Sequence, residues 1–480
     1  MTKILMFQGT GSGVGKSVLV AGFCRIIKNR GLKVLPFKSQ NMALNSGVTL
    51  DGLEMGRAQI VQAEACGVFP DVRMNPILLK PQGRGLSQLI RLGKVVGKYS
   101  AREYYKLSKE NFQIVKKTFD SLKLEADWIV IEGAGSPAEI NLQDTDIVNM
   151  KMAEYANAKV ILVGDIDRGG VFAWLKGTFD LIQERHRSLL HGMLINKFRG
   201  DVSLLDPGIK QFSKIVPIPL LGVIPWRDIK LEDEDSQNIK SHIVSDPILD
   251  IAVIHLPHIS NFTDFEPFKH IKGISVRFIK NISEIFNADL IIIPGSKNTL
   301  FDLGFLKNNG FYEILNNLSS KTWILGICGG FQMLGESVAD PDNLEQGGKM
   351  SALGLLPLST TLLGDKKLVR REYKGENLLK GLSWTGYEIH LGRSVFRVDP
   401  KESLVEKDQT LGVIDRDKKL IGTYIHGWFE NHKVSEKILS LIIGKKLKIP
   451  VSFNEIKNHE LNELAIFLEK HSNVDKILKF

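Results

Sequence analysis

Cysteine is scarce in this sequence, with three residues among 480: Cys24, Cys66 and Cys328. An odd number of widely separated cysteines provides neither a disulfide framework nor the ligand spacing of a zinc site. Free thiols are typical of a reducing compartment, so we expect a cytoplasmic protein. Cys24 and Cys66 lie in no glycine-bounded strand-to-helix turn and are expected to be small core residues.

Long hydrophobic runs are also missing. The opening stretch, MTKILMF, loses its apolar character at Gln8 and Gly9, so it does not resemble a signal peptide. No stretch approaches the ~18–20 apolar residues that cross a bilayer. The sequence therefore predicts no membrane span.

Aromatic residues do not interleave with the basic ones, although the net charge is +9. The densest basic patches are KKLVRR at 366–371 and KKLK at 445–448, and neither belongs to a nucleic-acid-binding module. We interpret both as solvated surface and expect no nucleic-acid partner. The positive excess would equally suit a polyanionic small substrate.

Short aliphatic runs bounded by Gly, Pro, Asn or Asp predict buried parallel strands along most of the chain. They lie at 3–7, 33–37, 128–133, 159–165 and 192–196, and again at 249–257, 288–296, 322–328 and 420–427. Helical patterns separate them; one of these covers 16–30 and stops at Gly31. Strands alternating with helices predict an α/β fold, here with two doubly wound domains.

The domain boundaries follow from an acidic, polar stretch, KLEDEDSQNIKSHIVSDP at 230–247. We predict a first domain at 1–235, a linker at 236–248 and a second domain at 249–440. A helical tail is expected at 441–480. No internal repeat or low-complexity segment interrupts this plan.

The stretch FQGTGSGVGKS at 7–17 joins a predicted strand to a predicted helix. A strict P-loop would need glycine where Thr10 stands, so the loop is one residue longer and starts at Gly9. Its glycines allow the backbone to approach an anion, and the N–H groups at the helix start face the phosphates. These glycines are Gly9, Gly11, Gly13 and Gly15. Lys16 supplies a point charge to the phosphates and Ser17 a hydroxyl ligand for magnesium.

Two polar residues at other strand ends belong to the same edge of the predicted sheet. Glu132 ends WIVIEG and is a candidate second magnesium ligand; its alternative role is a simple strand-end carboxylate. Asn196 in LINKFRG is a candidate reader of the nucleotide base.

Cys328 lies in WILGICGGFQMLG, inside a G-x-C-x-G turn between a strand and a helix. Such a turn exposes the sulfur, favours the thiolate and lets neighbouring N–H groups, such as that of Gly329, hold an oxyanion. The alternative is an inert buried cysteine.

The long loop, G-T-x-x-x-V-G-K-S, resembles that of dethiobiotin synthetases. The resemblance implies ATP with Mg²⁺, transfer of the γ-phosphoryl group to a carboxylate, and Lys38 as a second lysine beside the phosphates.

The second half resembles the flavodoxin-like domain of class I glutamine amidotransferases. The resemblance implies that His426, in GTYIHGWF, is the base for Cys328, and that Gly295 and Ser296, in IIIPGSKNT, form a second oxyanion element. Ordinary members carry an acidic residue two positions after the histidine, where this chain has Trp428. The third triad member is therefore missing or supplied elsewhere, and His390 in GYEIHLGRS is a competing base.

Both domains in this order resemble the corrinoid amidases, and most closely the cobyric acid synthase family. The matching segments are KSQNMALNS 38–46, MNPILLKP 74–81, IEGAGSPAEINLQDTDIVNM 131–150, GDIDRGGVFA 164–173, INKFRGD 195–201, GICGGFQMLG 326–335 and YEIHLGR 387–393. The resemblance implies glutamine as nitrogen donor and amidation of the b, d, e and g carboxylates of adenosylcobyrinic acid a,c-diamide. Ammonia would travel unprotonated from one site to the other.

The same resemblance assigns an acceptor site in the first domain. Asn41, Asn45 and Ser46 would line the corrin carboxylate site, and Arg168 would meet a carboxylate. Asp146, with Asp144 nearby, would serve catalysis beside the magnesium, the alternative being helix capping. Asp165 and Asp167 are either part of this site or turn formers.

Two rival functions stay open. Cobyrinic acid a,c-diamide synthases share both domains, although GAGSPAEINL and DIDRGGVFA favour the cobyric acid family. A P-loop regulatory ATPase with a degenerate second domain is the alternative outside the enzymes of this pathway, and the intact Cys328 and His426 argue against it.

Overall fold

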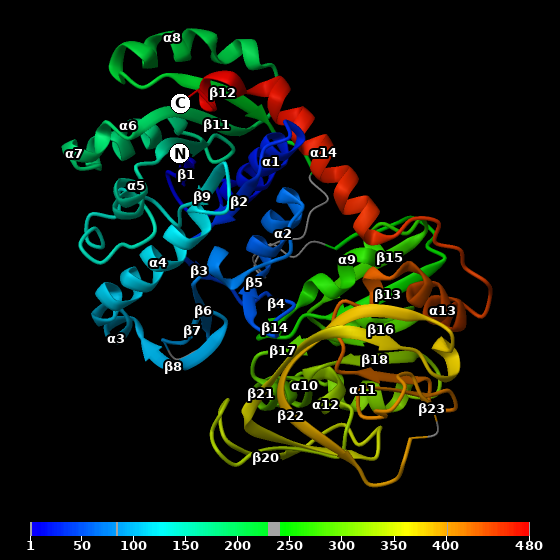
Figure 1. The fold of residues 1–480 in the computed structure, drawn as a ribbon. Helices are drawn as coiled ribbons and strands as arrows, with labels where there is room; N and C mark the ends of the chain where they lie inside the picture. The colour runs from blue at the N-terminus through cyan, green and yellow to red at the C-terminus, as the bar shows by residue number, and fades with distance from the viewer. Residues whose placement is uncertain (1, 83–84, 229–240, 401, 480) are drawn as a thin grey trace. The chain divides into compact units, whose positions relative to one another are not determined.

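The chain divides into two compact units in the computed structural model, which describes residues 2–82, 85–228, 241–400 and 402–479. The first unit comprises Met1–Ala43, Met55–Leu231 and Lys457–Phe480, and the second comprises Leu44–Glu54 and Glu232–Ile456. Each unit contains its own parallel sheet with helices (Figure 1). The predicted α/β class with two doubly wound domains is confirmed.

A six-stranded parallel sheet forms the centre of the first unit, in the order β12-β11-β10-β1-β9-β2. Its strands are β1 (Lys3–Gly9), β2 (Val34–Phe37), β9 (Trp128–Glu132), β10 (Lys159–Asp165), β11 (Leu190–Phe198) and β12 (Leu220–Pro225). The five strands predicted for this half of the chain are all present. Their residues are buried almost throughout, as expected for a sheet covered on both faces.

A second, smaller sheet of the first unit was not predicted. It has the order β3-β6-β7-β8 and consists of β3 (Gln40–Met42), β6 (Ile77–Pro81), β7 (Leu86–Arg91) and β8 (Lys94–Ser100). The helices of this unit are α1 (Lys16–Asn29), α2 (Arg57–Cys66), α3 (Ala101–Lys106), α4 (Ser108–Lys123), α5 (Met150–Ala156), α6 (Val171–Leu181), α7 (Glu184–Arg187) and α8 (Asp206–Ile215). Short 3-10 turns are η1 (Val72–Met74) and η2 (Val202–Leu205).

The helix that follows the glycine-rich loop, α1, ends as its sequence predicts. Its buried residues include Leu19, Val20, Phe23 and Ile27, which recur at helical spacing. Gly31 beyond its end has a φ of 78°, a conformation that glycine adopts without strain.

The second unit is built on a seven-stranded sheet in the order β15-β13-β16-β18-β25-β24-β23. The first five strands are parallel, and β24 is antiparallel to both of its neighbours, β25 and β23. The strands are β13 (Leu249–Ile254), β15 (Ile274–Ile279), β16 (Leu290–Ile293), β18 (Trp323–Ile327), β23 (Glu402–Ser403), β24 (Gly412–Asp415) and β25 (Leu420–Thr423). Four of them coincide with the strands predicted in this half, and one large apolar core packs around the sheet.

Further elements complete the second unit. A four-stranded sheet has the order β20-β19-β21-β22, with β19 (Ser337–Asp340), β20 (Gly348–Ser351), β21 (Leu358–Lys374) and β22 (Ser383–Phe396). The short strands β14 (Ile259–Ser260) and β17 (Gly295–Ser296) pair with each other. The helices are α9 (Glu266–Lys269), α10 (Thr299–Asn308), α11 (Phe311–Leu318), α12 (Gly329–Met333) and α13 (His432–Ile443), with 3-10 turns η4 (Phe262–Phe265), η5 (Ile282–Ile285), η6 (Asn377–Leu379) and η7 (Trp428–Glu430).

The C-terminal part of the chain returns to the first unit, which the order of the predicted domains does not suggest. The tail is helical, with α14 (Phe453–His471) and α15 (Val474–Ile477), and Lys457–Phe480 groups with the first unit. Leu461, Leu464 and Leu468 pack in the same core as α1. Residues 236–240 of the predicted linker lie outside the described residues, and His242 pairs with Val276 of β15.

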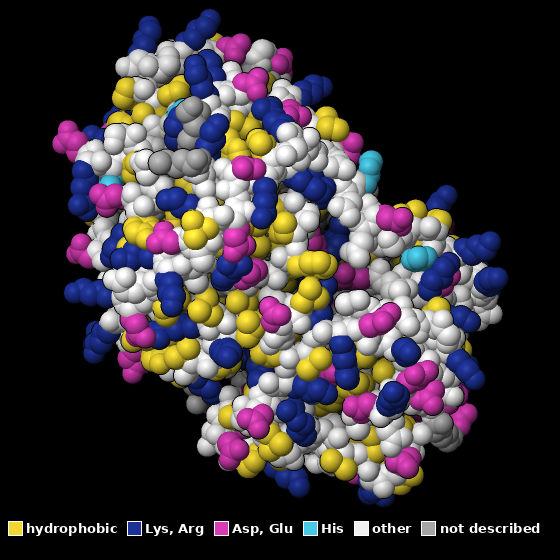
Figure 2. Space-filling view, viewed as in Figure 1, with side chains coloured by type: hydrophobic (Ala, Val, Ile, Leu, Met, Phe, Trp, Pro, Cys, Tyr) yellow, Lys and Arg dark blue, Asp and Glu magenta, His cyan; other side chains and the backbone are white. Residues whose placement is uncertain are grey.

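Among the residues that the structure describes, no helix is long and apolar enough to cross a membrane. On the face drawn in Figure 2, Lys and Arg side chains are interspersed with Asp and Glu side chains rather than gathered into one basic stripe.

Candidate functional sites

The glycine-rich loop between β1 and α1 has the backbone of an anion-binding turn. Gly15 has a φ of 96°, and a Cβ at this position would lie 2.3 Å from Asn196 Nδ2. A Cβ at Gly9 would lie 2.5 Å from Val14 Cγ2. Both positions therefore need glycine to form the loop.

Lys16 is held across the loop by main-chain oxygens. Its Nζ donates to the carbonyl of Gly11 at 2.9 Å and to that of Gly135 at 3.2 Å. Thr10 N–H donates to Val163 O at 2.9 Å, which fixes the loop start on β10. The ammonium group is thus kept at the loop that phosphates would enter.

Glu132 gathers three of the polar residues around this loop. Its Oε1 accepts from Ser17 Oγ and from Lys38 Nζ, both at 2.8 Å, and its Oε2 accepts from Gln62 Nε2 at 2.5 Å. Burial alone would raise the pKa of Glu132, but the Lys38 ammonium and these hydrogen bonds bring it below its usual value. The carboxylate is therefore ionised at neutral pH.

Asn196 stands at the loop as predicted, but its amide nitrogen is already used. Nδ2 donates to Val14 O at 2.8 Å, and the neighbouring Lys197 donates to Gly13 O at 2.6 Å and to Asp165 at 2.8 Å. The contact of Asn196 with the loop backbone means that the residue braces the phosphate loop.

Asp146 lies in a turn that supports the segment after β9. Its Oδ1 accepts from Val148 N–H at 2.8 Å and from Asn149 N–H at 3.3 Å, and burial raises its pKa. Asn149 in turn donates to Ala134 O at 2.7 Å, next to the Gly135 carbonyl that holds Lys16. Asp144 is exposed. Asp146 does not cap the following helix, because the N-cap residue of α5 is Asn149; a catalytic role for Asp146 stays a prediction.

The predicted acceptor residues fall in different parts of the structure. Asn41 is buried in the first unit and donates to Gln59 Oε1 at 2.9 Å. Asn45 and Ser46 belong to Leu44–Glu54, which groups with the second unit. Arg168 lies in the exposed turn between β10 and α6, where Asp165 accepts from Asp167 N–H at 2.9 Å.

Cys328 occupies a strained turn between β18 and α12. Its φ of 50° and ψ of −105° are unusual for any residue with a Cβ, which is typical of a nucleophile held at a sharp strand-to-helix turn. Its N–H donates to Thr423 O at 2.7 Å, and its sulfur lies 3.7 Å from Ile389 O. The side chain is mostly buried but retains 7% exposure.

The two predicted oxyanion elements meet beside Cys328. A Cβ on Gly329 would lie 2.9 Å from the Ser296 nitrogen, and a Cβ on Gly295 would lie 3.5 Å from His426 Cε1. Ser296 Oγ donates to Asp302 at 2.6 Å, which fixes this turn. The two elements thus lie close to each other, and an oxyanion-binding role for Gly295 and Gly329 stays a prediction.

His426 has an acidic partner that the sequence did not reveal. Its Nδ1 lies 2.6 Å from Asp264 Oδ2, and Asp264 Oδ1 accepts the Gly427 N–H at 2.9 Å. Burial alone lowers the pKa of His426, but Asp264 and the nearby Cys328 together raise it to about 10. Nε2 is buried and, among the described residues, has no partner in hydrogen-bond geometry.

Trp428, at the position where related enzymes carry the acid, is fully buried in η7. The acidic partner of His426 is instead Asp264, which lies in η4, 162 positions earlier in the chain. In NFTDFEPF, the position of Asp264 between Phe262 and Phe265 could have indicated a buried acid that needs a partner, but not which residue that partner is.

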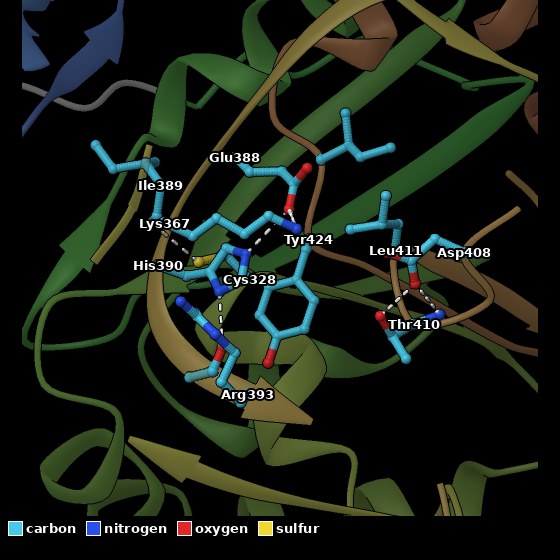
Figure 3. A network of polar contacts seen from close by, with 12 residues as sticks. Cys328, Lys367, Glu388, Ile389, His390, Arg393, Asp408, Thr410, Leu411 and Tyr424 are labelled. Carbon is cyan, nitrogen blue, oxygen red and sulfur yellow. Dashed lines mark hydrogen bonds and ion pairs between the residues drawn. The ribbon is translucent and has the colours of Figure 1, made fainter. Parts of the chain in front are cut away.

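His390 is engaged elsewhere (Figure 3). Its Nδ1 lies 2.8 Å from Gly392 O and its Nε2 lies 3.3 Å from Glu388, while its ring stacks on Tyr424. Burial lowers its pKa, and Glu388 also pairs with Lys367 at 2.6 Å. With both ring nitrogens occupied, His390 is a weaker candidate base than His426.

A second residue missed from the sequence is Gln62. It lies with Gln59 on α2, and both side chains are fully buried. Gln62 Oε1 and Gln59 Nε2 have no hydrogen-bond partner among the described residues. Two buried glutamines three positions apart on one helix would have been a usable signal.

The oxygen donors at Glu132 suit magnesium. Ser17 Oγ and Glu132 Oε1 are hard ligands 2.8 Å apart, the kind that Mg²⁺ combines with phosphate oxygens and water. In the described part of the chain, no cluster of three or more His, Cys, Asp or Glu side chains could hold a metal by itself. A metal here would therefore arrive with a phosphate ligand.

The two halves match two family models. Residues 5–239 match the CobQ/CobB/MinD/ParA nucleotide binding domain, and residues 250–434 match the CobB/CobQ-like glutamine amidotransferase domain. Among individual relatives, the chain is 45% identical to a cobyric acid synthase of Caldanaerobacter subterraneus subsp. tengcongensis, over 98% of this chain and 97% of that protein. It is 46% identical to a cobyric acid synthase of Lachnoclostridium phytofermentans (99% and 98% covered) and 44% identical to one of Listeria welshimeri (100% and 96%).

Proposed function

The chain belongs to the cobyric acid synthase family of glutamine-dependent ligases, and on that premise we propose its reaction. We propose that it amidates the b, d, e and g carboxylates of adenosylcobyrinic acid a,c-diamide, with ATP, Mg²⁺ and glutamine. The observation that carries the proposal is the His426–Asp264 pair beside the strained Cys328, in a chain that also holds the Lys16–Ser17–Glu132 cluster.

Glutamine hydrolysis is assigned to the second unit. The Cys328 sulfur attacks the side-chain carbonyl carbon of glutamine, and N–H groups near Gly329 and Gly295 stabilise the oxyanion. Because Asp264 keeps His426 protonated, the histidine can give its proton to the departing ammonia. Water then cleaves the thioester, with His426 accepting a proton, and glutamate is released.

Activation of the acceptor is assigned to the first unit. A carboxylate oxygen attacks the γ-phosphorus of ATP, giving a carboxyl phosphate and ADP, and ammonia then displaces phosphate to form the amide. Lys16 and Lys38 stabilise the negative charge of the transferring group. Ser17 and Glu132 would hold Mg²⁺, which supplies charge neutralisation at the phosphates when bound.

The acceptor itself is proposed to bind around Asn41, with Asn45, Ser46 and Arg168 as predicted contacts. Gln59 and Gln62 join this set because Gln59 Nε2 and Gln62 Oε1 are buried without a hydrogen-bond partner among the described residues, while Gln62 Nε2 donates to Glu132. Asn196 is proposed to support the nucleotide through the loop rather than through the base.

Mass spectrometry of the corrinoid product tests the proposal. The protein is incubated with adenosylcobyrinic acid a,c-diamide, ATP, magnesium and glutamine, and we expect stepwise mass changes of carboxylate-to-amide conversion. Amidation of cobyrinic acid at positions a and c instead would favour the a,c-diamide synthase reaction. ATP hydrolysis without any amide or glutamate would favour a regulatory ATPase.

A further inference from the structure

Leu44–Glu54, here called the inserted segment, leaves the first unit and packs in the second. It follows β3 and precedes α2, both elements of the first unit, yet it groups with the second unit. It contains β4 (Ser46–Val48), which pairs with β5 (Glu54–Gly56). Because β3 before it and α2 after it both belong to the first unit, the packing of this short segment in the second unit needs an explanation.

Buried charge holds the inserted segment in place. Glu54 is 1% exposed; it forms an ion pair with Lys366 and accepts from Ser46 Oγ at 2.9 Å. Arg370 donates to Val48 O at 3.3 Å. The KKLVRR patch at 366–371 is therefore only partly the solvated surface that the sequence suggested: Lys366 is largely buried, whereas Arg371 is exposed. Lys366 and Arg370 contact the inserted segment, while Lys367 and Arg371 pair with Glu388.

Asn261 connects the inserted segment to the glutaminase site. Its Nδ2 donates to Ser46 O at 3.2 Å and to Tyr387 Oη at 3.1 Å. Asn261 has a φ of 53° and begins η4, the turn that carries Asp264, whose N–H donates to Asn261 O at 3.1 Å. The same residue thus contacts the inserted segment and sets the turn that presents the acid to His426.

Tyr387 supports the histidine directly. Its ring stacks on that of His426, with centroids 5.2 Å apart and planes 19° from parallel. The two backbones also exchange hydrogen bonds, from His426 N–H to Tyr387 O at 2.8 Å and from Tyr387 N–H to His426 O at 3.1 Å. Any displacement of Tyr387 would therefore move the imidazole.

Val48 of the inserted segment packs on the residues that hold both catalytic groups. It is fully buried in a small cluster with Tyr387 and Ile389. Tyr387 supports His426, and the Ile389 carbonyl lies 3.7 Å from the Cys328 sulfur. Through Val48, the inserted segment therefore contacts one residue that packs on the proposed base and one that lies next to the proposed nucleophile.

We propose that the inserted segment is a positioning element of the glutaminase site, acting through Val48 and Asn261 on Tyr387, His426 and Cys328. The proposal rests on the proposed function, because it concerns the glutamine-hydrolysing step assigned to Cys328. Its consequence is that part of the polypeptide between Asn41 and Gln59, the acceptor side of the chain, is required to set the geometry of glutamine hydrolysis.

Asn261→Gly tests the hydrogen bonds of Asn261 most directly. Glycine adopts a positive φ without strain, so the substitution removes the two side-chain hydrogen bonds and leaves the backbone able to keep its conformation. Asn377→Gly is the matched control, because Asn377 also has a positive φ, of 46°, and also donates to a main-chain oxygen, Ser403 O at 2.8 Å. Val48→Ala, with Val276→Ala of β15 as its control, tests the apolar contact, and both valines are fully buried.

The measurements are kcat and KM for glutamate release, together with amide synthesis from ammonium by the full chain. We expect Asn261→Gly and Val48→Ala to lower glutaminase kcat by about tenfold or more while KM changes little, because small displacements of catalytic groups are costly. Synthesis from ammonium should stay within about twofold of the parent protein, since it does not use the thiol. The two controls should keep the parental kcat.

Three results would overturn or separate the proposals. Parental kcat in both Asn261→Gly and Val48→Ala, or an equal loss in their controls, removes the positioning role. A rise in KM with unchanged kcat assigns the contacts to glutamine binding and also overturns it. If the parent protein makes no amide from ammonium but releases glutamate, the proposed function fails while the positioning role still stands.

Discussion

Replacing Asp264 by asparagine tests how the glutaminase base is prepared. Asp264 accepts His426 Nδ1–H at 2.6 Å with one oxygen and Gly427 N–H at 2.9 Å with the other. Asparagine has the same shape but a single acceptor oxygen. If that oxygen stays on Gly427, the amide NH₂ group faces Nδ1, which must then carry a lone pair. The single ring proton then sits on Nε2, so the ring no longer takes the Cys328 proton to form the imidazolium that Asp264 stabilises.

The magnitude follows from the charge that the carboxylate stabilises. Although burial lowers the pKa of His426, Asp264 and Cys328 raise it from 6.5 to about 10. That difference corresponds to roughly 5 kcal/mol in favour of the imidazolium. Most of it comes from Asp264, so a loss of about 4 kcal/mol would lower kcat by about 10³-fold.

The assay compares glutamate release from glutamine with amide synthesis from ammonium. Asp264→Asn should lose the first by about 10³-fold and keep the second, since the ammonia route bypasses the thiol. Asp302 is a poor control position because its carboxylate accepts a hydrogen bond from Ser296 of the predicted oxyanion element. Asp340→Asn is the control instead, because Asp340 is a buried acid that accepts N–H groups of the turn at 344–347. A parental glutaminase rate in Asp264→Asn would refute the reasoning.

The other predictions concern both sites. Cys328→Ala should abolish glutamine-dependent synthesis and retain synthesis from ammonium; loss of both would contradict separate sites. Lys16→Ala should eliminate amide formation with either nitrogen source, and residual synthesis from ammonium near the parental rate would exclude Lys16 as phosphate ligand. Gln62→Leu should lower synthesis from ammonium by about tenfold, because Glu132 loses a buried hydrogen bond, with glutaminase activity as the unchanged reference. The stability that the His426–Asp264 pair contributes should be complete below pH 6.5, the ordinary pKa of histidine, and lost as pH rises through about 10. The gap in urea midpoint between the parent and Asp264→Asn should therefore narrow over this range, and a gap that widens would contradict the sign.

Much of the site could be predicted because its chemistry is local. Gly15, Lys16 and Ser17 are consecutive, and the phosphate loop they form depends on the conformation of a few neighbouring residues. Cys328 is recognisable for the same reason, since the glycines next to it in the sequence predict its strained turn. In both places, a short stretch of sequence contains the residues that make the geometry.

Other parts of the site depend on residues far apart in the chain. Asp264 was not predicted, because an acid 162 positions from His426 leaves no pattern near the histidine. Base recognition by Asn196 stays a prediction, and nothing in LINKFRG indicates that its amide also donates to Val14 O. The basic patch at 366–371 looked solvated because its partners, Glu54 and Glu388, come from distant segments.

By itself, the sequence determined the alternation of strands and helices, the glycine-rich loop before α1 and the turn at Cys328, because hydrophobic period, glycine content and strand ends are properties of neighbouring residues. Only the tertiary structure decided which acid serves His426, that Leu44–Glu54 packs in the second unit, and that Lys457–Phe480 returns to the first. These choices depend on burial and charge pairing between segments that meet only after folding, so no local pattern encodes them.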